Sequence, residues 1–187
     1  MHFLFSLSKR LEAISTGIGR ASVWLMLLLM LVIVTDVTMR RWFVIGSTKL
    51  QELEWHLHGA LFLLCLGWAY TKNIHVRIEL ISERFNRRSA ASIEMLGCLF
   101  FLLPYVAAIL IFGYDYVAYS VKYSEASASA TGLPFRWIIK SMIVVGFGLL
   151  GFAAFARLLE SFVFLFGPKF LAEQTMFADP HPNQGQS

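Results

Sequence analysis

The sequence predicts an all-α integral membrane protein with four transmembrane helices and a short interfacial amphipathic helix between helices 2 and 3. Of the 187 residues, 57% are apolar and only 15% are charged, whereas a soluble domain carries about a quarter charged residues. The mean hydropathy is +0.63. Four apolar stretches approach the ~20 residues that a helix needs to cross a bilayer. This composition excludes a disordered chain and an ordinary soluble enzyme.

The first elements are an amphipathic N-terminal segment, residues 1–20, which can lie in the membrane interface, and a span at about residues 21–39. Basic residues before an apolar run also resemble a signal peptide. This run continues into polar residues without a small-residue cleavage site, so we expect an uncleaved span. Asp36 and Arg40 lie one helical turn apart near its end. We interpret them as an ion pair that lowers the cost of charge near the bilayer.

Three more apolar stretches complete a four-helix transmembrane domain over residues 21–166, and they lie at about 54–70, 93–113 and 138–166. Pro104 falls inside the third span and should kink it, because proline removes one backbone donor and clashes with the preceding turn. Trp137 begins the fourth helix and is expected to anchor it at the lipid interface. The remaining residues, 167–187, form a polar tail that we expect to be disordered.

The distribution of positive charge predicts the orientation. Four spans place both termini on one side of the membrane, and this side carries nine Lys and Arg residues against six on the other. The nine are Lys9, Arg10, Arg20, Lys72, Arg77, Arg84, Arg87, Arg88 and Lys169, and the six are Arg40, Arg41, Lys49, Lys122, Arg136 and Lys140. Since cytoplasmic loops are enriched in Lys and Arg, both termini are predicted to be cytoplasmic. Orientation also accounts for the net charge of +4, so we expect no nucleic-acid binding.

The loop between the second and third spans contains the predicted interfacial helix. Arg77, Arg84 and Arg88 are spaced to share one helical face, from which they can reach lipid headgroups. The adjacent apolar stripe consists of Ile78, Ile81 and Phe85. The positive-inside bias alone also explains these arginines, so the apolar stripe is the additional evidence for a helix here.

The densest polar cluster lies at the head of the second span, where carboxylates and histidines suggest a metal or haem site. Helical geometry argues against such a site. Glu52 and His56 share one helical face. Glu54 and His58 share another, which is offset by two residues or about 200°. The alternatives are an interfacial helix cap anchored by Trp55 and a contact with a partner subunit, and the two are compatible.

The other charged and reactive residues suggest no chemistry of their own. Arg157 and Glu160 are interpreted as an ion pair near the cytoplasmic interface. The spans lack the facing carboxylates that a self-sufficient ion-coupled carrier needs. Cys65 and Cys98 lack the spacing of thiol oxidoreductases. No hydrolase, metalloprotease, P-loop or dinucleotide-binding motif occurs, so we predict no enzyme activity, no cofactor and no metal site.

Several segments, in order along the chain, together resemble one protein family. They are Glu52–Leu64, Ala69–Lys72 with His75–Glu79, Leu102–Pro104, and Ser124–Ser127 with Gly132–Lys140. In this order they resemble the small membrane subunit of tripartite ATP-independent periplasmic (TRAP) transporters, the DctQ-like family, over about residues 24–166. The chain departs from the family pattern at Asn73 and Ile74, where a charged residue and a glycine are usual.

The resemblance implies a noncatalytic four-helix subunit of an importer in the bacterial inner membrane. In such an importer a periplasmic binding protein delivers an organic acid, typically a carboxylate. A large membrane subunit, here expected to be a separate chain, carries the acid by an elevator motion that is usually coupled to sodium. The small subunit braces the fixed part of the large subunit and offers periplasmic surface to the binding protein.

The resemblance also suggests roles for individual residues. Expected contacts with the large subunit are Glu52, Glu54, Trp55 and His58. Expected contacts with the binding protein, in the loop before the fourth span, are Glu125, Arg136 and Lys140. The alternative function is a small membrane anchor subunit of a redox complex that carries haem or quinone. A visible absorption spectrum that depends on His56 or His58 would distinguish that anchor.

Overall fold

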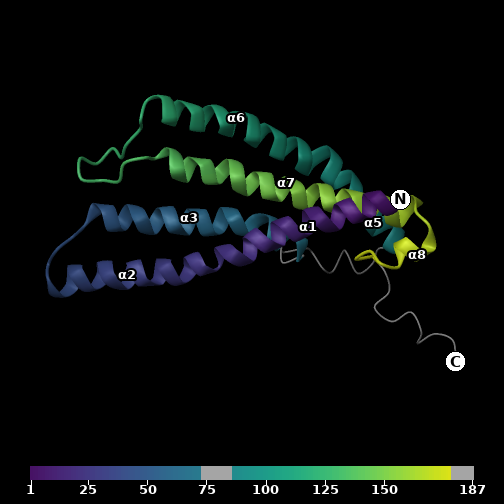
Figure 1. Cartoon of the computed structure of the whole chain (residues 1–187), viewed down its shortest axis with the longest axis horizontal. Coiled ribbons are helices and arrows are strands. Elements are labelled where there is room, and N and C mark those ends of the chain that lie inside the picture. The colour runs from purple at the N-terminus through teal and green to yellow at the C-terminus, as the bar shows by residue number, and fades with distance from the viewer. Residues whose placement is uncertain (73–85, 178–187) are drawn as a thin grey trace.

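The computed structural model describes residues 1–72 and 86–177, and all regular secondary structure in this part of the chain is helical. The elements are α1 (His2–Ser22), α2 (Trp24–Trp42), α3 (Thr48–Thr71), α5 (Arg87–Gly97), the π-helix η1 (Cys98–Leu102), α6 (Leu103–Lys122), α7 (Trp137–Phe166) and α8 (Lys169–Ala172). Figure 1 shows that they form an elongated assembly of long helices.

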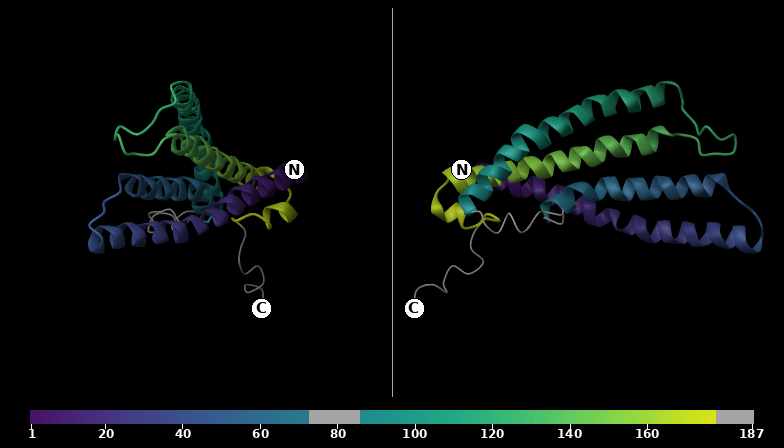
Figure 2. Two further views of the ribbon diagram at one scale, coloured as in Figure 1. Left: turned by 60° about the vertical axis from the view of Figure 1, so that its left-hand side comes forward. Right: turned by 180° about the vertical axis from the view of Figure 1, so that it is seen from behind.

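Four long helices lie side by side in the order α2, α3, α7, α6 (Figures 1 and 2). Helix α1 leads into α2 through Val23, whose backbone is itself helical, and packs against both α3 and α7. The helices are separated at the end that carries the loops 43–47 and 123–136. They converge at the opposite end, where α1, α5 and α8 gather (Figure 1). We call these the loop end and the terminal end.

Three helical stretches are long and apolar enough to cross a membrane, namely His2–Trp42, Arg87–Lys122 and Trp137–Phe166. The sequence predicts four spans, so the count differs by one. The stretch that does not qualify is α3, because its first half carries polar residues, including Glu52, Glu54 and His58. The all-helical architecture is confirmed over the described residues, and three helical stretches qualify as spans by length and composition.

The segments that flank the predicted spans are described only in part. Arg77 and Arg84, on which the interfacial helix depends, lie outside the described residues. Arg88 is exposed in the first turn of α5, which begins before the predicted third span. The first part of the predicted polar tail includes α8, where Leu171 is buried.

Pro104 has the predicted effect on the third span. It lies at the start of α6, directly after the five-residue π-helix η1. Proline cannot donate a backbone hydrogen bond to the preceding turn and its ring crowds that turn, and a π-helical turn accommodates both effects. Helices α5 and α6 therefore form one bent rod that follows α7 (Figure 2).

The centre of the structure is the contact between α3 and α7, where backbones approach each other directly. A Cβ atom on Gly67 would lie 2.7 Å from the carbonyl oxygen of Leu149. A Cβ atom on Gly146 would lie 2.6 Å from the carbonyl oxygen of Leu63. Small residues allow such close approach between membrane helices, where dispersion forces replace the hydrophobic effect. The two glycines therefore set the distance between α3 and α7.

Helix α1 joins this contact through small polar residues. Ser8, Ser15 and Ser22 recur every seven residues and are buried. The Ser15 hydroxyl donates a hydrogen bond to the carbonyl oxygen of Leu149 at 2.9 Å. Gly19 faces Trp68 so closely that a methyl group there would overlap the indole side chain. One face of α1 is thus adapted to both α3 and α7.

A cluster of charged side chains, built on the buried Arg157 and Glu160 of α7, joins the helices at the terminal end. The predicted pair is present, with Arg157 Nη1 at 3.4 Å from Glu160 Oε2. Lys9 of α1 adds a second cation, 2.7 Å from Glu160 Oε1. Arg157 also donates to the carbonyl oxygen of Thr71 and contacts Met176. The cluster therefore ties α1, the end of α3 and the segment after α8 to α7.

We expect Gly146→Ala to destabilise the fold, because the added methyl group meets backbone rather than a movable side chain. Overpacking of this kind costs ~1–3 kcal/mol, and a chain of this length loses about 2–4 °C in Tm per kcal/mol. Thermal unfolding of the purified full chain in detergent measures the effect.

Gly148→Ala is the matched control on the same helix, since nothing lies within 4 Å of its added methyl group. Its Tm should stay unchanged or rise, because alanine favours helix over glycine by ~1 kcal/mol. Equal Tm values for the two variants would show that α3 and α7 do not need direct backbone contact.

Candidate functional site at the loop end

The loop end brings together most of the residues that the sequence singles out. The loop 123–136 joins α6 to α7 and lies beside the head of α3 (Figure 1). The helix α3 starts at its cap Ser47, whose side chain accepts a hydrogen bond from the Leu50 amide. The polar cluster that follows Ser47 in the sequence therefore occupies the first turns of α3, and Glu52 is its member that contacts the loop.

Glu52 fastens the loop to α3. Its Oε2 atom accepts a hydrogen bond from the Leu133 amide at 2.6 Å, and its Oε1 atom accepts one from the Ser127 hydroxyl. The Leu133 and Ser127 hydrogen bonds hold the pKa of the Glu52 carboxyl below its usual value, and the charges of His56 and Arg136 contribute further. Glu52 thus acts as an internal latch between two segments far apart in the sequence.

The loop has its own backbone pairing. The Ser127 amide donates to the Leu133 carbonyl, and the Arg136 amide donates to the Glu125 carbonyl, both at 3.1 Å. The loop begins and ends with residues at positive φ, Ser124 (46°) and Phe135 (61°). A left-handed backbone costs a non-glycine residue about 1–2 kcal/mol. Such conformations persist where the surrounding contacts fix them, and the pairing with Glu52 provides such contacts.

An ion pair supports the loop from the other side. Glu125 pairs with Lys140 of α7, and the Lys140 ammonium lies 3.8 Å from the centre of the Tyr116 ring. Lys140 is only 7% exposed. The hydrogen bond from Lys140 holds the pKa of the Glu125 carboxyl below its usual value. Arg136, by contrast, is exposed at the surface.

An open groove runs next to this loop. Its volume is about 410 Å³, and it is lined by Val121, Ser124, Pro134, Phe135 and Trp137. The Phe135 ring is 61% exposed. An aromatic groove beside an exposed arginine has the composition of the central residues in protein interfaces.

The polar head of α3 is divided between two faces, as its helical spacing predicts. Glu52 faces the loop, whereas Glu54 lies between α3 and α2 and lines a pocket there. Trp55 and His58 are exposed on the outer surface. Within the described ranges no group of three His, Cys, Asp or Glu side chains lies close enough to hold a metal ion. The four residues therefore do not form one site.

Sequence reasoning missed the long-range partners of these residues. It identified the pairs Asp36–Arg40 and Arg157–Glu160, and both are present. It assigned Lys9 only to the charge balance, whereas Lys9 is part of the buried cluster at the terminal end. Nothing in the local pattern around Lys9 indicates a partner 151 residues away.

Comparison with known proteins gives one match. The family model of the DctQ component of tripartite ATP-independent periplasmic transporters matches residues 29–164. This stretch runs from α2 to the end of α7 and includes the whole loop end. No curated protein and no solved structure matches the chain.

The two lowered carboxyl pKa values predict how the loop responds to acid. The hydrogen bonds of Glu52 and the ion pair of Glu125 contribute their full stability above the usual carboxyl pKa of 4.5. This contribution is lost as the pH falls through the lowered pKa of each carboxyl in the folded protein. A fluorophore attached at position 128, in the loop, should keep constant anisotropy from pH 7 to about 4.5 and lose anisotropy at lower pH as the loop detaches.

Glu52→Gln should reduce the anisotropy near neutral pH, because the amide lacks the charge that strengthens both hydrogen bonds. Glu54→Gln is the control, since Glu54 faces α2. If Glu52→Gln and Glu54→Gln titrate alike, Glu52 does not hold the loop.

Proposed function

The chain belongs to the DctQ component family of tripartite ATP-independent periplasmic transporters, and from this premise we propose that it is a noncatalytic scaffold for the large transport subunit. The family match over residues 29–164 carries the proposal. The transported compound is proposed to be an organic acid of the carboxylate class, delivered by a periplasmic binding protein and carried by the large subunit with sodium coupling.

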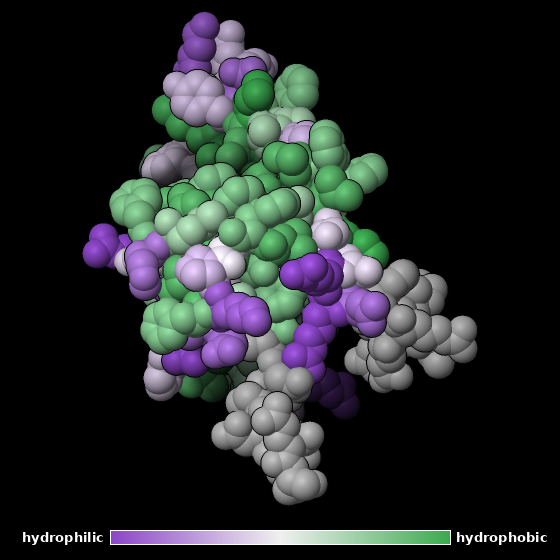
Figure 3. Space-filling view, turned by 90° about the vertical axis from the view of Figure 1, so that its right-hand side faces the viewer, coloured by the Kyte–Doolittle hydropathy of each residue, from purple (hydrophilic) through white to green (hydrophobic). Residues whose placement is uncertain are grey.

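The outward faces of the helices support a scaffold role. Large apolar side chains are exposed along α2, η1 and α6, among them Leu31, Val34, Phe101, Ile111 and Phe112. Hydrophobic side chains also cover much of the face seen from the terminal end (Figure 3). Soluble proteins rarely expose contiguous apolar surface of this extent. Lipid tails and the apolar helices of a larger subunit are the surroundings that suit it.

We propose that α3 is the fourth span. It has 24 residues, enough for the ~20 that a bilayer requires, and it lies between α2 and α7 along their length (Figure 1). Its first residues, up to Glu52, precede the span predicted at about residues 54–70 and lie at the loop end, where the loop satisfies the Glu52 carboxylate.

We propose that the terminal end lies in the cytoplasm and the loop end in the periplasm, as four spans and the nine-to-six distribution of Lys and Arg predict. We expect a cysteine at the exposed position 130 to react with a membrane-impermeant thiol reagent in whole cells. A cysteine at the exposed position 89 of α5 should not react. The parent chain gives the background from Cys65 and Cys98. Labelling at position 89 and protection at position 130 would reverse the proposed orientation.

The proposed docking surface for the binding protein is the exposed part of the loop end. It consists of Arg136 and the groove beside Phe135. Glu125 and Lys140 are already engaged with each other, so we propose that they support this surface from within. Transient complexes use polar, salt-sensitive contacts of this kind, which mainly change the association rate.

The proposed contact with the large subunit involves the outer face of α3. Trp55 is 71% exposed and His58 also faces outward, and aromatic residues are enriched in protein interfaces. The redox-anchor alternative gains no support from the family match. His56 and His58 lie on the same helix, whereas a haem between helices needs histidines that face each other.

We expect Arg136→Glu to raise the binding-protein concentration needed for half-maximal uptake by roughly 1.4–5-fold, which corresponds to the 0.2–1 kcal/mol of an exposed ion pair. Reconstituted transport at varied binding-protein concentration measures it. Lys169→Glu makes the same charge change at the terminal end and should leave the value unchanged. A normally assembled Arg136→Glu complex with an unchanged concentration dependence would exclude Arg136 from docking.

A further inference from the structure

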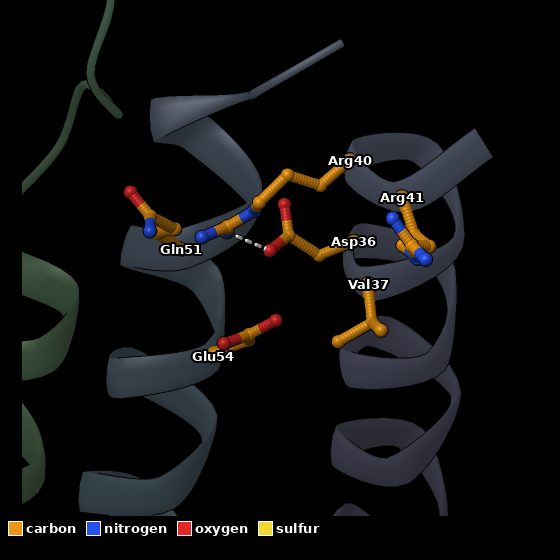
Figure 4. Close-up of a pocket in the computed structure, with 6 residues that line it drawn as sticks. All are labelled: Asp36, Val37, Arg40, Arg41, Gln51 and Glu54. Atoms are coloured by element: carbon orange, nitrogen blue, oxygen red, sulfur yellow. Dashed lines mark hydrogen bonds and ion pairs between the residues drawn. The ribbon is translucent and has the colours of Figure 1, made fainter. Parts of the chain in front are cut away.

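A pocket that the transport role does not use lies between α2 and α3 at the loop end. Its volume is about 470 Å³, and it is open to the outside. The residues that line it are Asp36, Val37, Arg40, Arg41, Gln51 and Glu54. Figure 4 shows Asp36 extending from α2 and Glu54 from α3 into the space between the two helices.

The pocket contains two carboxylate oxygens that lack a hydrogen-bond donor among the described residues. Asp36 is only 2% exposed. Its Oδ2 atom pairs with Arg40, but its Oδ1 atom is buried without a partner. Glu54 Oε1 is buried without a partner as well. Buried charged acceptors are normally satisfied, so both atoms are open to a donor from beyond the described residues.

Arg40 reaches neither of these two oxygens. It extends from α2, pairs with Asp36 Oδ2 and, with the Gln51 amide turned so that its oxygen faces the guanidinium, donates to Gln51 Oε1 of α3 at 3.0 and 3.3 Å. Arg41 is the second cation at the pocket and is exposed. Two carboxylates and two guanidinium groups give the pocket no net charge, so it suits a ligand that carries one charge of each sign.

The surroundings of the pocket indicate a lipid rather than a soluble ligand. Val37 in its wall is exposed, and the outward side of α2 continues with exposed apolar residues such as Val34 and Leu31. Trp42 and Trp55 are exposed at the same end. Tryptophan and arginine beside an apolar helix face mark the headgroup layer of a bilayer.

We propose that the α2–α3 pocket binds the headgroup of phosphatidylethanolamine. The primary ammonium donates hydrogen bonds to Asp36 Oδ1 and Glu54 Oε1, the phosphate lies toward Arg41, and the acyl chains follow the apolar side of α2. A choline headgroup has no N–H donor for the carboxylates. Phosphatidylglycerol lacks the cation, and a lysine from a protein lacks the phosphate. The inference goes beyond the transport role and needs only that the chain lies in a bilayer.

The first test compares headgroups on the unaltered full-length chain. Native mass spectrometry would count the lipids retained in micelles that contain phosphatidylethanolamine, its N-methyl and N,N-dimethyl derivatives, phosphatidylcholine or phosphatidylglycerol, all with the same acyl chains. Retention should fall at the second methyl group, which leaves one N–H donor for two carboxylates, and again at the third. Phosphatidylethanolamine should be preferred over phosphatidylcholine by at least tenfold, because the loss of one charge-assisted hydrogen bond alone corresponds to about that factor and choline loses both.

The second test uses Glu54→Gln, which leaves the Asp36–Arg40 pair intact and should reduce that preference severalfold. Asp115→Asn, on the exposed side of α6, is the control and should keep it.

Three results would overturn the proposal. They are equal retention of phosphatidylethanolamine and phosphatidylcholine, a preference for phosphatidylglycerol, and a preference that Glu54→Gln leaves unchanged. If the chain has no lipid preference but Glu54→Gln releases a co-purifying membrane subunit, the carboxylates bind a protein cation instead.

Discussion

The direct backbone contact between α3 and α7 is the constraint on which the rest of the structure depends. Gly67 and Gly146 bring the two helices so close that carbonyl groups occupy the space that side chains would need. This contact places α3, the most polar of the long helices, in the middle of the layer. It also fixes where α1 packs, because Ser15 binds the same Leu149 carbonyl that faces Gly67.

Polar groups then secure the layer at both ends. At the terminal end, the cluster of Lys9, Arg157 and Glu160 joins α1 to α7. At the loop end, Glu52 joins α3 to the loop, and Lys140 joins the loop to α7. Arg157 and Glu160 are both buried, and removing one partner of a buried ion pair leaves an uncompensated charge, so the cluster at the terminal end resists separation of the helices. A layer secured at both ends is stiff, which suits a scaffold within a larger transporter.

The same arrangement divides the surface of the protein by function. Polar side chains with internal partners, such as Glu52 and Lys140, hold the loop in shape. Exposed residues such as Arg136, Phe135 and Trp55 are then available to other molecules. The pocket at Asp36 is intermediate, because its carboxylate is buried yet only half satisfied. The side chains that hold the loop in place are therefore neighbours of those that are exposed to other molecules, but the two sets are different.

The sequence by itself determined everything that depends on local spacing. Apolar run length predicted the long helices, Pro104 predicted the interruption before α6, and i to i+3 or i+4 spacing predicted the pairs of Asp36 and Arg157. The helical offset between Glu52 and Glu54 correctly placed them on different faces. The segments that resemble the DctQ family fall within the region that its family model matches.

Only the tertiary structure decided which distant groups meet. The contacts of Glu52 with Leu133, of Lys9 with Glu160 and of Gly146 with Leu63 depend on how whole helices are positioned. Local sequence does not predict how the helices are positioned. Helix periodicity gives the direction in which a side chain leaves the axis of its own helix, but it does not say which other helix packs on that side. The sequence therefore identified the charged and aromatic residues that stand out in their helices. Packing decided whether each of them holds a loop in place, joins two elements through a buried contact or stays exposed for contact with another molecule.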